Sequence, residues 1–223
     1  MIDYAVQRAN MIESQIRPNG ITDARVIAAM AEIPREAFVP PEKQALAYMD
    51  DDLPLGWDAA GRRRWLIEPM SLGRLLQMAV IDGEDKVLDV GCATGYSSAV
   101  LSRLAKRVVA LEDDPVLAEF AMLQLRALGQ TNVEVIVAPP AVGHEALAPY
   151  DVILVNGRLR RVPDDLVRQL APGGRLVAAI GDGATSPATV LTRAGQSWSS
   201  RREFDMFVPE AAGFPGVDPG FAF

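Results

Sequence analysis

Short apolar runs alternate with helix-like segments from Lys86 onward, and this alternation constrains the fold more than any other feature of the sequence. Apolar runs separated by helices predict a parallel sheet that is buried on both faces. Two late segments rich in β-forming residues predict an antiparallel hairpin that closes the sheet. The expected strands are 86–90, 107–111, 133–137, 151–155 and 175–180, then the hairpin 189–192 and 203–208 joined by 195–200; the expected helices are 97–106, 115–128 and 163–170.

The first 85 residues have a different pattern, with helices separated by proline-containing turns. Residues 23–33 carry apolar side chains on one helical face and stop before Pro34, and residues 70–80 return to helical spacing. Residues 50–66 contain two glycines and a proline, which favours a loop. We therefore expect a helical extension with an active-site loop over 1–85 and an α/β core over 86–223, forming one structural domain overall.

Composition excludes several classes of protein. The chain carries 22 basic and 29 acidic side chains, whereas a protein that neutralises nucleic-acid phosphates would normally have the opposite excess. No stretch approaches the ~18 apolar residues of a membrane span, and the N-terminus lacks the pattern of a signal peptide. The single cysteine, Cys92, excludes an internal disulfide and a cysteine-rich zinc site. These features favour a cytoplasmic protein without a metal, with no nucleic acid or membrane as partner.

The turn after the first core strand carries the main functional signal. The segment Val87–Tyr96 reads VLDVGCATGY, and such a turn forms the ligand crevice of an open α/β sheet. Its glycines, Gly91 and Gly95, have the spacing G-x-x-x-G and not the G-x-G-x-x-G of dinucleotide-binding turns. Asp89 precedes the turn, where an acid would repel a phosphate but can hold a cationic group. The pattern predicts a ligand without phosphates, whose approach the glycines permit.

A second acid, Glu112, ends the next strand. An acid at that position can accept hydrogen bonds from both hydroxyls of a ribose. A nucleoside with a cationic tail is S-adenosylmethionine, so we predict this cofactor. A glycine turn after a strand is often purely structural, but the two acids and the glycine pair occur here in the order that a cofactor site requires. The expected cofactor-binding residues are Asp89, Gly91, Cys92, Ala93, Gly95, Tyr96, Glu112 and Asp113.

The chain resembles the protein-L-isoaspartate O-methyltransferase family from about Met11 to Pro209. The cofactor turn is shared by many methyltransferases, whereas the N-terminal run that carries the resemblance is more specific. The similar segments are Gly20–Asp23 with Val26, Ala29-Met30, Ile33–Pro40, Ala47-Tyr48, Leu53–Gly56, Ala148–Asp151 with Leu170, and Gly173–Val177.

The resemblance implies a Rossmann-like class I methyltransferase that methylates the free carboxylate of isoaspartyl residues in damaged proteins. Such a carboxylate is already a nucleophile, so the enzyme needs to position it in line with the methyl group and requires no general base. A protein or peptide isoaspartyl carboxylate, or another small carboxylate, is the expected acceptor. The protein is expected to be a monomer or homodimer.

Two positions depart from the family pattern. Aligning Pro69 with the family's glycine-glutamine-threonine-isoleucine-serine-glutamine-proline stretch places Ile67 at the active-site serine, and isoleucine cannot donate a hydrogen bond. The family's adenine-contacting aspartate falls on Pro139, which has neither the carboxylate nor a backbone donor. The sequence thus leaves open a different acceptor, or a cofactor-binding protein without transfer activity.

Other candidates are less specific. His144 is interpreted as a surface or structural residue, and Cys92 as a small filler of the turn. The run Arg62–Arg64 favours a solvated loop over an anion clamp, although arginine pairs well with carboxylates. We expect the loop 58–65 to cover the cofactor pocket as a mobile segment. The apolar tail 214–223 is expected to pack on the core or on a second subunit.

Overall fold

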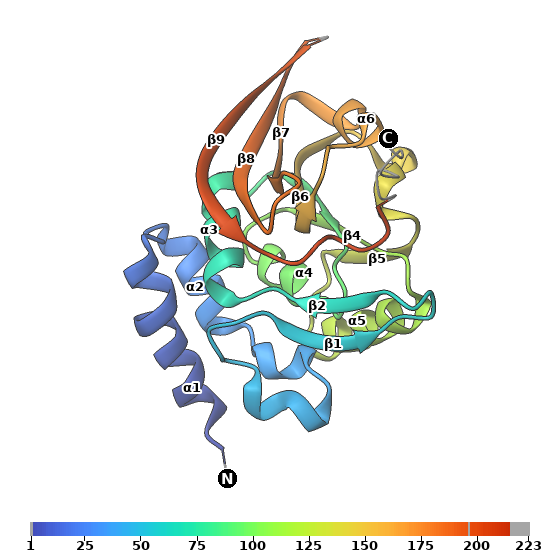
Figure 1. Cartoon of the computed structure of the whole chain (residues 1–223). Helices are drawn as coiled ribbons and strands as arrows, with labels where there is room; N and C mark the ends of the chain where they lie inside the picture. The colour runs from blue at the N-terminus through green and yellow to red at the C-terminus, as the bar shows by residue number, and fades with distance from the viewer. Residues whose placement is uncertain (1, 196, 215–223) are drawn as a thin grey trace, which may run out of the picture.

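A seven-stranded sheet forms the centre of the computed structural model, which describes residues 2–195 and 197–214 (Figure 1). The strand order is β5-β4-β3-β6-β7-β8-β9. The first five strands in this order are parallel, and β7, β8 and β9 pair antiparallel. The predicted α/β fold and its C-terminal hairpin are confirmed, but both hairpin strands are longer than predicted, and residues 197–200, expected in the connection, belong to the last strand. Residues 215–223, which include most of the apolar tail, lie outside the described residues.

The elements follow one another along the chain with these bounds. The α-helices are α1 (Tyr4–Met11), α2 (Ala24–Glu32), α3 (Pro69–Ala79), α4 (Tyr96–Leu101), α5 (Pro115–Ala127) and α6 (Asp164–Arg168). The strands are β1 (Leu53–Trp57), β2 (Arg63–Leu66), β3 (Lys86–Val90), β4 (Arg107–Glu112), β5 (Val133–Val137), β6 (Tyr150–Leu159), β7 (Leu170–Ile180), β8 (Thr185–Ala194) and β9 (Ser197–Phe207). Short helical turns occur at Ile12–Ile16, Arg17–Asn19, Arg35–Phe38, Pro41–Leu46, Pro140–Val142 and Glu145–Leu147.

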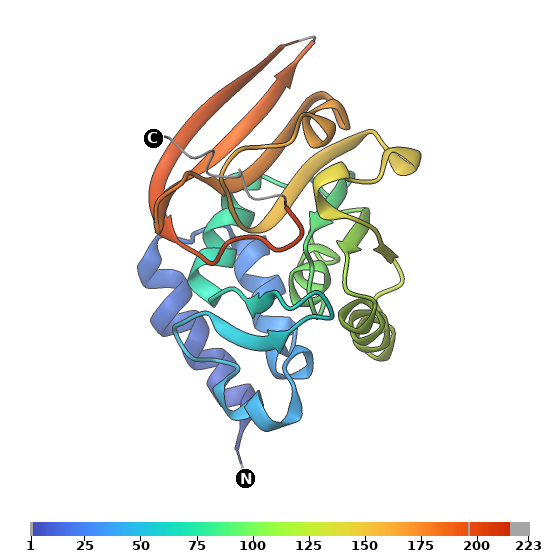
Figure 2. The same cartoon turned by 45° about the vertical axis from the view of Figure 1, so that its right-hand side comes forward.

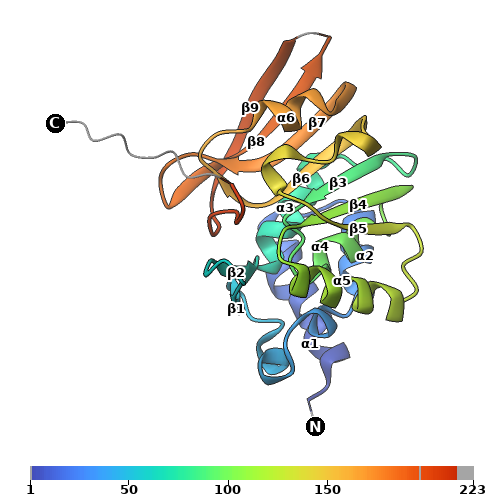
Figure 3. The ribbon, with the colours of Figure 1, turned by 90° about the vertical axis from the view of Figure 1, so that its right-hand side faces the viewer.

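The central parallel strands β3, β4 and β6 are mostly apolar and buried, because each face of the sheet packs against other elements. Val87 of β3 belongs to the same buried cluster as side chains of α2, α3, α4 and α5, whereas Leu88 belongs to a second cluster with α6. In side view, α4 and α5 lie on one face of the sheet and α6 on the other (Figure 3). The β8–β9 hairpin extends beyond this body (Figure 2). No helix in the described part of the chain is long and apolar enough to cross a membrane.

A fully buried arginine, Arg35, connects the N-terminal helical segment with the β1–β2 hairpin and with the start of α4. Arg35 follows α2 and donates from Nε to the Ala47 carbonyl at 2.7 Å and from Nη2 to the Ile67 carbonyl at 2.8 Å. Its guanidinium also lies 4.9 Å from the centre of the Tyr96 ring. Burial lowers the pKa of this guanidinium. Arg35 therefore fixes the backbone at Ile67 relative to the start of α4.

The predicted loop over 50–66 is wrong, because this segment contains a β-hairpin. β1 and β2 pair antiparallel, with Leu53 opposite Leu66 and both side chains buried. The register shifts between Pro54 and Gly56, so the proline and glycine that favoured a loop lie at an irregularity within the ladder. The helices predicted over 97–106 and 163–170 are also shorter than expected, as their bounds in α4 and α6 show.

Candidate functional site

The turn between β3 and α4 is held against the end of β4. The amides of Gly91 and Cys92 both donate to the Leu111 carbonyl, at 2.9 and 3.0 Å. The Gly95 amide donates to the Cys92 carbonyl at 2.8 Å and so closes the turn. The structure therefore brings the predicted turn and the predicted acid Glu112 together at the carboxyl edge of the sheet.

Asp89 is fully buried beneath this turn. Its carboxylate accepts hydrogen bonds from the hydroxyls of Ser97, at 2.7 Å, and Ser98, and from the Asn156 amide at 2.6 Å. Burial raises the pKa of Asp89, and the three donors oppose that change. These contacts join β3 to α4 and β6. A contact between Asp89 and a cofactor stays a prediction.

Glu112 is also fully buried, and its two carboxylate oxygens have four donors between them. One oxygen accepts from the amides of Asp113 and Asp114, each at 3.0 Å. The other accepts from the Ala93 amide at 2.8 Å and from the guanidinium of Arg64. Burial raises the pKa of Glu112, with the charge of Arg64 acting in the opposite direction. A carboxylate has about four acceptor positions, so Glu112 is saturated in this conformation.

Two arginines of the β1–β2 hairpin bind carboxylates around Glu112. Arg64 lies 3.0 Å from an Asp113 oxygen and 3.3 Å from Asp58, and Arg62 contacts the same two acids at 2.6 and 2.8 Å. The interpretation of this run as a solvated loop is wrong for Arg64, which is 4% exposed. Side chains alternate along β2, so the neighbours Arg63 and Arg64 point to opposite faces. Arg64 points inward, whereas Arg63 is exposed, with its guanidinium 5.2 Å from the centre of the Trp57 ring and 5.5 Å from that of Trp65.

In this cluster the arginines and the acids shift one another's pKa values toward the charged forms. Burial alone would raise the pKa of Asp113, but hydrogen bonds from Arg62 and Arg64 lower it. Burial would raise the pKa of Asp58 as well, and the Arg62 amide and the Arg64 guanidinium lower it. The pKa of Arg64 is raised, since Glu112 and Asp113 outweigh the effect of its own burial. These directions favour the charged forms of Asp58, Asp113 and Arg64, whose ion pairs hold the hairpin against the end of β4.

The space between the hairpin and the turn is small. The cavity has a volume of about 20 Å³ and is lined by Arg64, Ile67, Gly91, Ala93 and Asn156, among others. That volume accommodates about one water molecule, whereas ligand pockets typically measure about 300–1,000 Å³. The segment 58–65 lies over the turn between β3 and α4, as predicted, because Arg64 bonds to Glu112 and lines the cavity; that this cavity is the cofactor pocket stays a prediction. The mobility of the segment also stays a prediction.

The C-terminal segment covers the same cavity from another side. The Arg158 amide donates to the Pro209 carbonyl at 2.8 Å, and the Ala211 amide donates to the Arg158 carbonyl at 2.9 Å. This pairing brings Gly213 against Asp113 and Pro140, so close that a Cβ there would lie 2.6 Å from an Asp113 oxygen. Pro139, the position of the family's adenine-contacting acid, is exposed next to this contact.

Two further predicted residues of the turn, Tyr96 and Cys92, are buried, and their contact with a cofactor stays a prediction. The Tyr96 ring is fully buried against Phe38, with ring centres 5.8 Å apart. Cys92 is buried, and burial raises the pKa of its thiol well above the ordinary value, which agrees with a filler and not a nucleophile. His144, which lies outside this turn, is half-buried. Its backbone carbonyl accepts a hydrogen bond from the Tyr150 hydroxyl at 2.7 Å, in agreement with its interpretation as a structural residue.

The two glycines of the turn differ in what a side chain would meet. Gly91 has φ +70° with nothing within 4 Å of a Cβ, whereas a Cβ on Gly95, at φ +94°, would lie 3.0 Å from the Ala121 methyl. We expect Gly91→Ala to lower the free energy of unfolding by about 1 kcal/mol through backbone strain. Gly95→Ala should lower it by about 2–3 kcal/mol, because crowding against α5 is added. Urea denaturation measures both, and equal losses would contradict the packing role of Gly95.

Sequence reasoning missed several residues that surround the cavity. Asn156 lies on β6, next to β3 in the sheet, and donates to both Asp89 and the Val90 carbonyl. An amide at the carboxyl end of a central parallel strand is the signal that could have found it. Glu210 also lines the cavity and was missed, whereas Trp65, which lines it too, ends the loop 58–65 that was predicted to lie there. Glu210 reaches it through the C-terminal segment, whose pairing with β6 has no local sequence signal.

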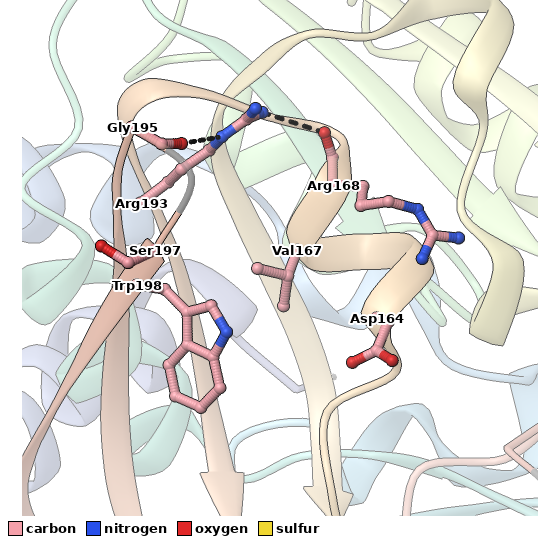
Figure 4. Close-up of a pocket in the computed structure, with 7 residues that line it drawn as sticks. All are labelled: Asp164, Val167, Arg168, Arg193, Gly195, Ser197 and Trp198. Carbon is pink, nitrogen blue, oxygen red and sulfur yellow. Dashed lines mark hydrogen bonds between the residues drawn. The ribbon is translucent and has the colours of Figure 1, made fainter.

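A second hollow lies far from this site, between α6 and the end of the β8–β9 hairpin (Figure 4). Trp198 and Val167 line it, together with two arginines. Arg193 donates to the carbonyls of Gly195, Arg168 and Leu170, so its guanidinium serves to hold the hairpin against α6. The buried carboxylates of Asp89 and Glu112 and the turn between β3 and α4 lie at the other site.

Comparison with known proteins identifies the family. The model of the family "Protein-L-isoaspartate(D-aspartate) O-methyltransferase (PCMT)" matches residues 6–213. The chain belongs to this family. Among curated members, the protein-L-isoaspartate O-methyltransferase of Methanoregula boonei is 39% identical, over 91% of this chain and 92% of that protein. The protein of the same name from Methylorubrum extorquens is 36% identical, over 97% of this chain and 93% of its own length.

Solved structures of the family share the fold. A protein-L-isoaspartate O-methyltransferase structure matches with a TM-score of 0.80 and 26% identity, covering 92% of this chain and 66% of that chain. A structure from Plasmodium falciparum, described as a putative member in complex with S-adenosyl-L-homocysteine, matches with a TM-score of 0.77 and 19% identity. That match covers 96% of this chain and all of the other. The resemblance found in the sequence is thereby confirmed over most of the chain.

Proposed function

We propose that this chain transfers a methyl group from S-adenosylmethionine to a carboxylate, with isoaspartyl residues of damaged proteins as the acceptors. Membership of the family over residues 6–213 supports the reaction class. The observation that carries the cofactor assignment is the position of Glu112 beside the Gly91–Ala93 turn, joined to it by the hydrogen bond from the Ala93 amide. A buried acid in this place suits the two hydroxyls of a ribose.

Several features of the turn fit the cofactor. Gly91 leaves open space where any other residue would place a Cβ. The Thr94 hydroxyl is buried in the same turn and has no hydrogen-bond partner among the described residues, so it is free for a ligand. Asp89 and Glu112 supply negative charge for a ligand with a cationic tail. When bound, S-adenosylmethionine would supply an electrophilic methyl group, and the protein would hold its nucleoside at Glu112.

The acceptor side supports the same reaction class but leaves the acceptor less well defined. A carboxylate acceptor needs positioning and no base, and no residue of this site has to remove a proton. Ile67 lines the cavity without a donor, and the Asn156 amide is already bonded to Asp89 and Val90. The missing hydroxyl at position 67 favours a second candidate function, methyl transfer to a different small carboxylate. A cofactor-binding protein without transfer activity is the third.

The partners and the location are part of the same proposal. We assign the protein to the cytoplasm and expect a monomer or a homodimer that meets its acceptor as a protein or peptide. The acidic balance of the chain, with a formal charge of −7, supports a partner other than nucleic acid.

The test combines a binding assay with a transfer assay on the full chain. Calorimetry should detect S-adenosylhomocysteine binding and no binding of NAD. Labelled S-adenosylmethionine should then label an isoaspartyl peptide but not the peptide of the same sequence with normal aspartate. Labelling of a small carboxylate in place of the peptide would identify the second candidate. Binding without transfer to any acceptor would identify the third, and NAD binding without S-adenosylhomocysteine binding would refute the proposal.

A further inference from the structure

The predicted ribose acceptor is bonded to the protein's own arginine. Arg64 donates to Glu112 at the oxygen that also accepts from the Ala93 amide, while the other oxygen accepts from two amides. The three amides belong to the turn and to the start of α5, so they remain in place when a ligand binds. Arg64 is the only one of the four donors on a side chain of another element. Ribose hydroxyls can therefore bind Glu112 only at the position that Arg64 holds.

The contact is one of several that hold the whole hairpin in this position. Asp58, before the tip, accepts from the amides of Ala60 and Arg62, at 3.0 and 2.8 Å. The Ala59 amide donates at 2.9 Å to Asp114, the acid that caps α5. Arg62 reaches Asp113, as described above. The hairpin is thus bonded both to itself and to the acidic end of β4, and its tip and Arg64 should move together.

We infer that Arg64 competes with the cofactor's ribose for Glu112, so that the β1–β2 hairpin has a closed position, in which Arg64 binds Glu112, and opens when the nucleoside binds. This inference rests on the proposed function, because it concerns the same cofactor. The cavity of about 20 Å³ beneath the hairpin agrees with it, since that space accommodates no nucleoside. Asp58 remains bonded to the hairpin's own arginines, so opening does not leave the Arg64 guanidinium without an anion.

The competition lowers the apparent affinity for the cofactor. Only the open fraction of the protein binds, and the apparent dissociation constant rises in inverse proportion to that fraction. A hairpin that is closed in about nine molecules of ten weakens binding about tenfold. The cofactor would then occupy its site only at concentrations high enough to displace Arg64 from Glu112.

The test compares S-adenosylhomocysteine affinity among four proteins by calorimetry. Arg64→Met keeps the aliphatic stem and removes the guanidinium, and it should bind about tenfold more tightly than the wild type. Asp58→Asn weakens the contacts of Asp58 with Arg62 and Arg64 and leaves Glu112 unchanged, so it should increase the affinity for S-adenosylhomocysteine by a smaller factor. Arg107→Ala is the matched control, since it removes a cation that pairs with Glu134 at 2.6 Å at the opposite end of β4, and it should bind like the wild type. S-adenosylhomocysteine is the ligand of choice because it lacks the sulfonium charge of S-adenosylmethionine. Removing the Arg64 cation therefore changes charge repulsion with this ligand less than it would with S-adenosylmethionine.

Hydrogen exchange provides a readout that does not depend on the variants. Ligand binding usually slows exchange, but here saturating S-adenosylhomocysteine should accelerate exchange of the Ala59 amide in the wild type, because its bond to Asp114 breaks on opening. Equal or weaker binding by Arg64→Met, together with unchanged or slower exchange at Ala59, would overturn the inference while leaving the proposed function intact. Absence of binding by all four proteins would overturn both.

Discussion

Glu112→Ala is expected to lower the free energy of unfolding by about 3–5 kcal/mol, as is typical when one partner of a buried ion pair is removed. The variant leaves the guanidinium of Arg64 buried with one anion fewer, and three amides lose their acceptor. Because those amides belong to the turn and to the start of α5, the loss should affect the whole edge of the sheet. Urea denaturation of the ligand-free protein measures the change through the midpoint and slope of the transition.

Glu134→Ala is the control for this prediction. Glu134 pairs with Arg107 at 2.6 Å on neighbouring strands of the same sheet, but the two side chains are 49% and 47% exposed. Exposed ion pairs contribute little, so this variant should stay within about 0.5 kcal/mol of the wild type. A loss of less than 1 kcal/mol in Glu112→Ala would mean that Glu112 contributes little to stability, and the closed hairpin would then be weakly held.

The parallel sheet was predictable because its central strands are buried on both faces. The apolar run 86–90 is typical of that environment and matches the bounds of β3. The run 133–137 also matches its strand, β5, although β5 lies at the edge of the sheet and its residues are half-buried or exposed. The hairpin β1–β2 was not predictable in the same way. Its stability comes from the burial of Leu53 and Leu66 and from the bonds of Arg64, all contacts with distant segments, while its local sequence contains residues typical of loops.

The candidate site shows the same division between local and distant information. The turn and Glu112 were predicted because each has a fixed position at the end of a strand. The partner of Glu112 was missed because Arg64 lies 48 residues earlier in the chain, in a segment expected to be solvated. Period-two alternation in Arg63–Leu66 would have placed Arg64 and Leu66 on one face, had the segment been interpreted as a strand. A buried acid that is predicted to bind a ligand can equally well be bonded to the protein itself.

Ile67→Ser tests whether the missing hydroxyl limits isoaspartyl methylation. The Arg35 guanidinium donates a hydrogen bond to the Ile67 carbonyl at 2.8 Å. This bond fixes the backbone at position 67, so a serine there should project in the same direction as the isoleucine does. Ile67 is 4% exposed and belongs to the main buried cluster, so the serine variant loses apolar burial as well. Its folded fraction has to be measured first, and Ile67→Val provides a matched variant that changes the size of the side chain but adds no donor.

We expect Ile67→Ser to methylate an isoaspartyl peptide ten or more times faster than the wild type, per folded molecule. A hydrogen bond to a charged group contributes about 1.5–3 kcal/mol, which corresponds to about one to two powers of ten in rate. The wild type should label the peptide slowly but measurably, because the Ile67 side chain has no hydrogen-bond donor and the Asn156 amide is already bonded to Asp89 and Val90. Ile67→Val should behave like the wild type. High wild-type turnover with no gain from serine would show that this position does not limit the reaction. Inactivity of all three proteins, with S-adenosylhomocysteine still bound, would instead indicate that the methyl acceptor is a different carboxylate.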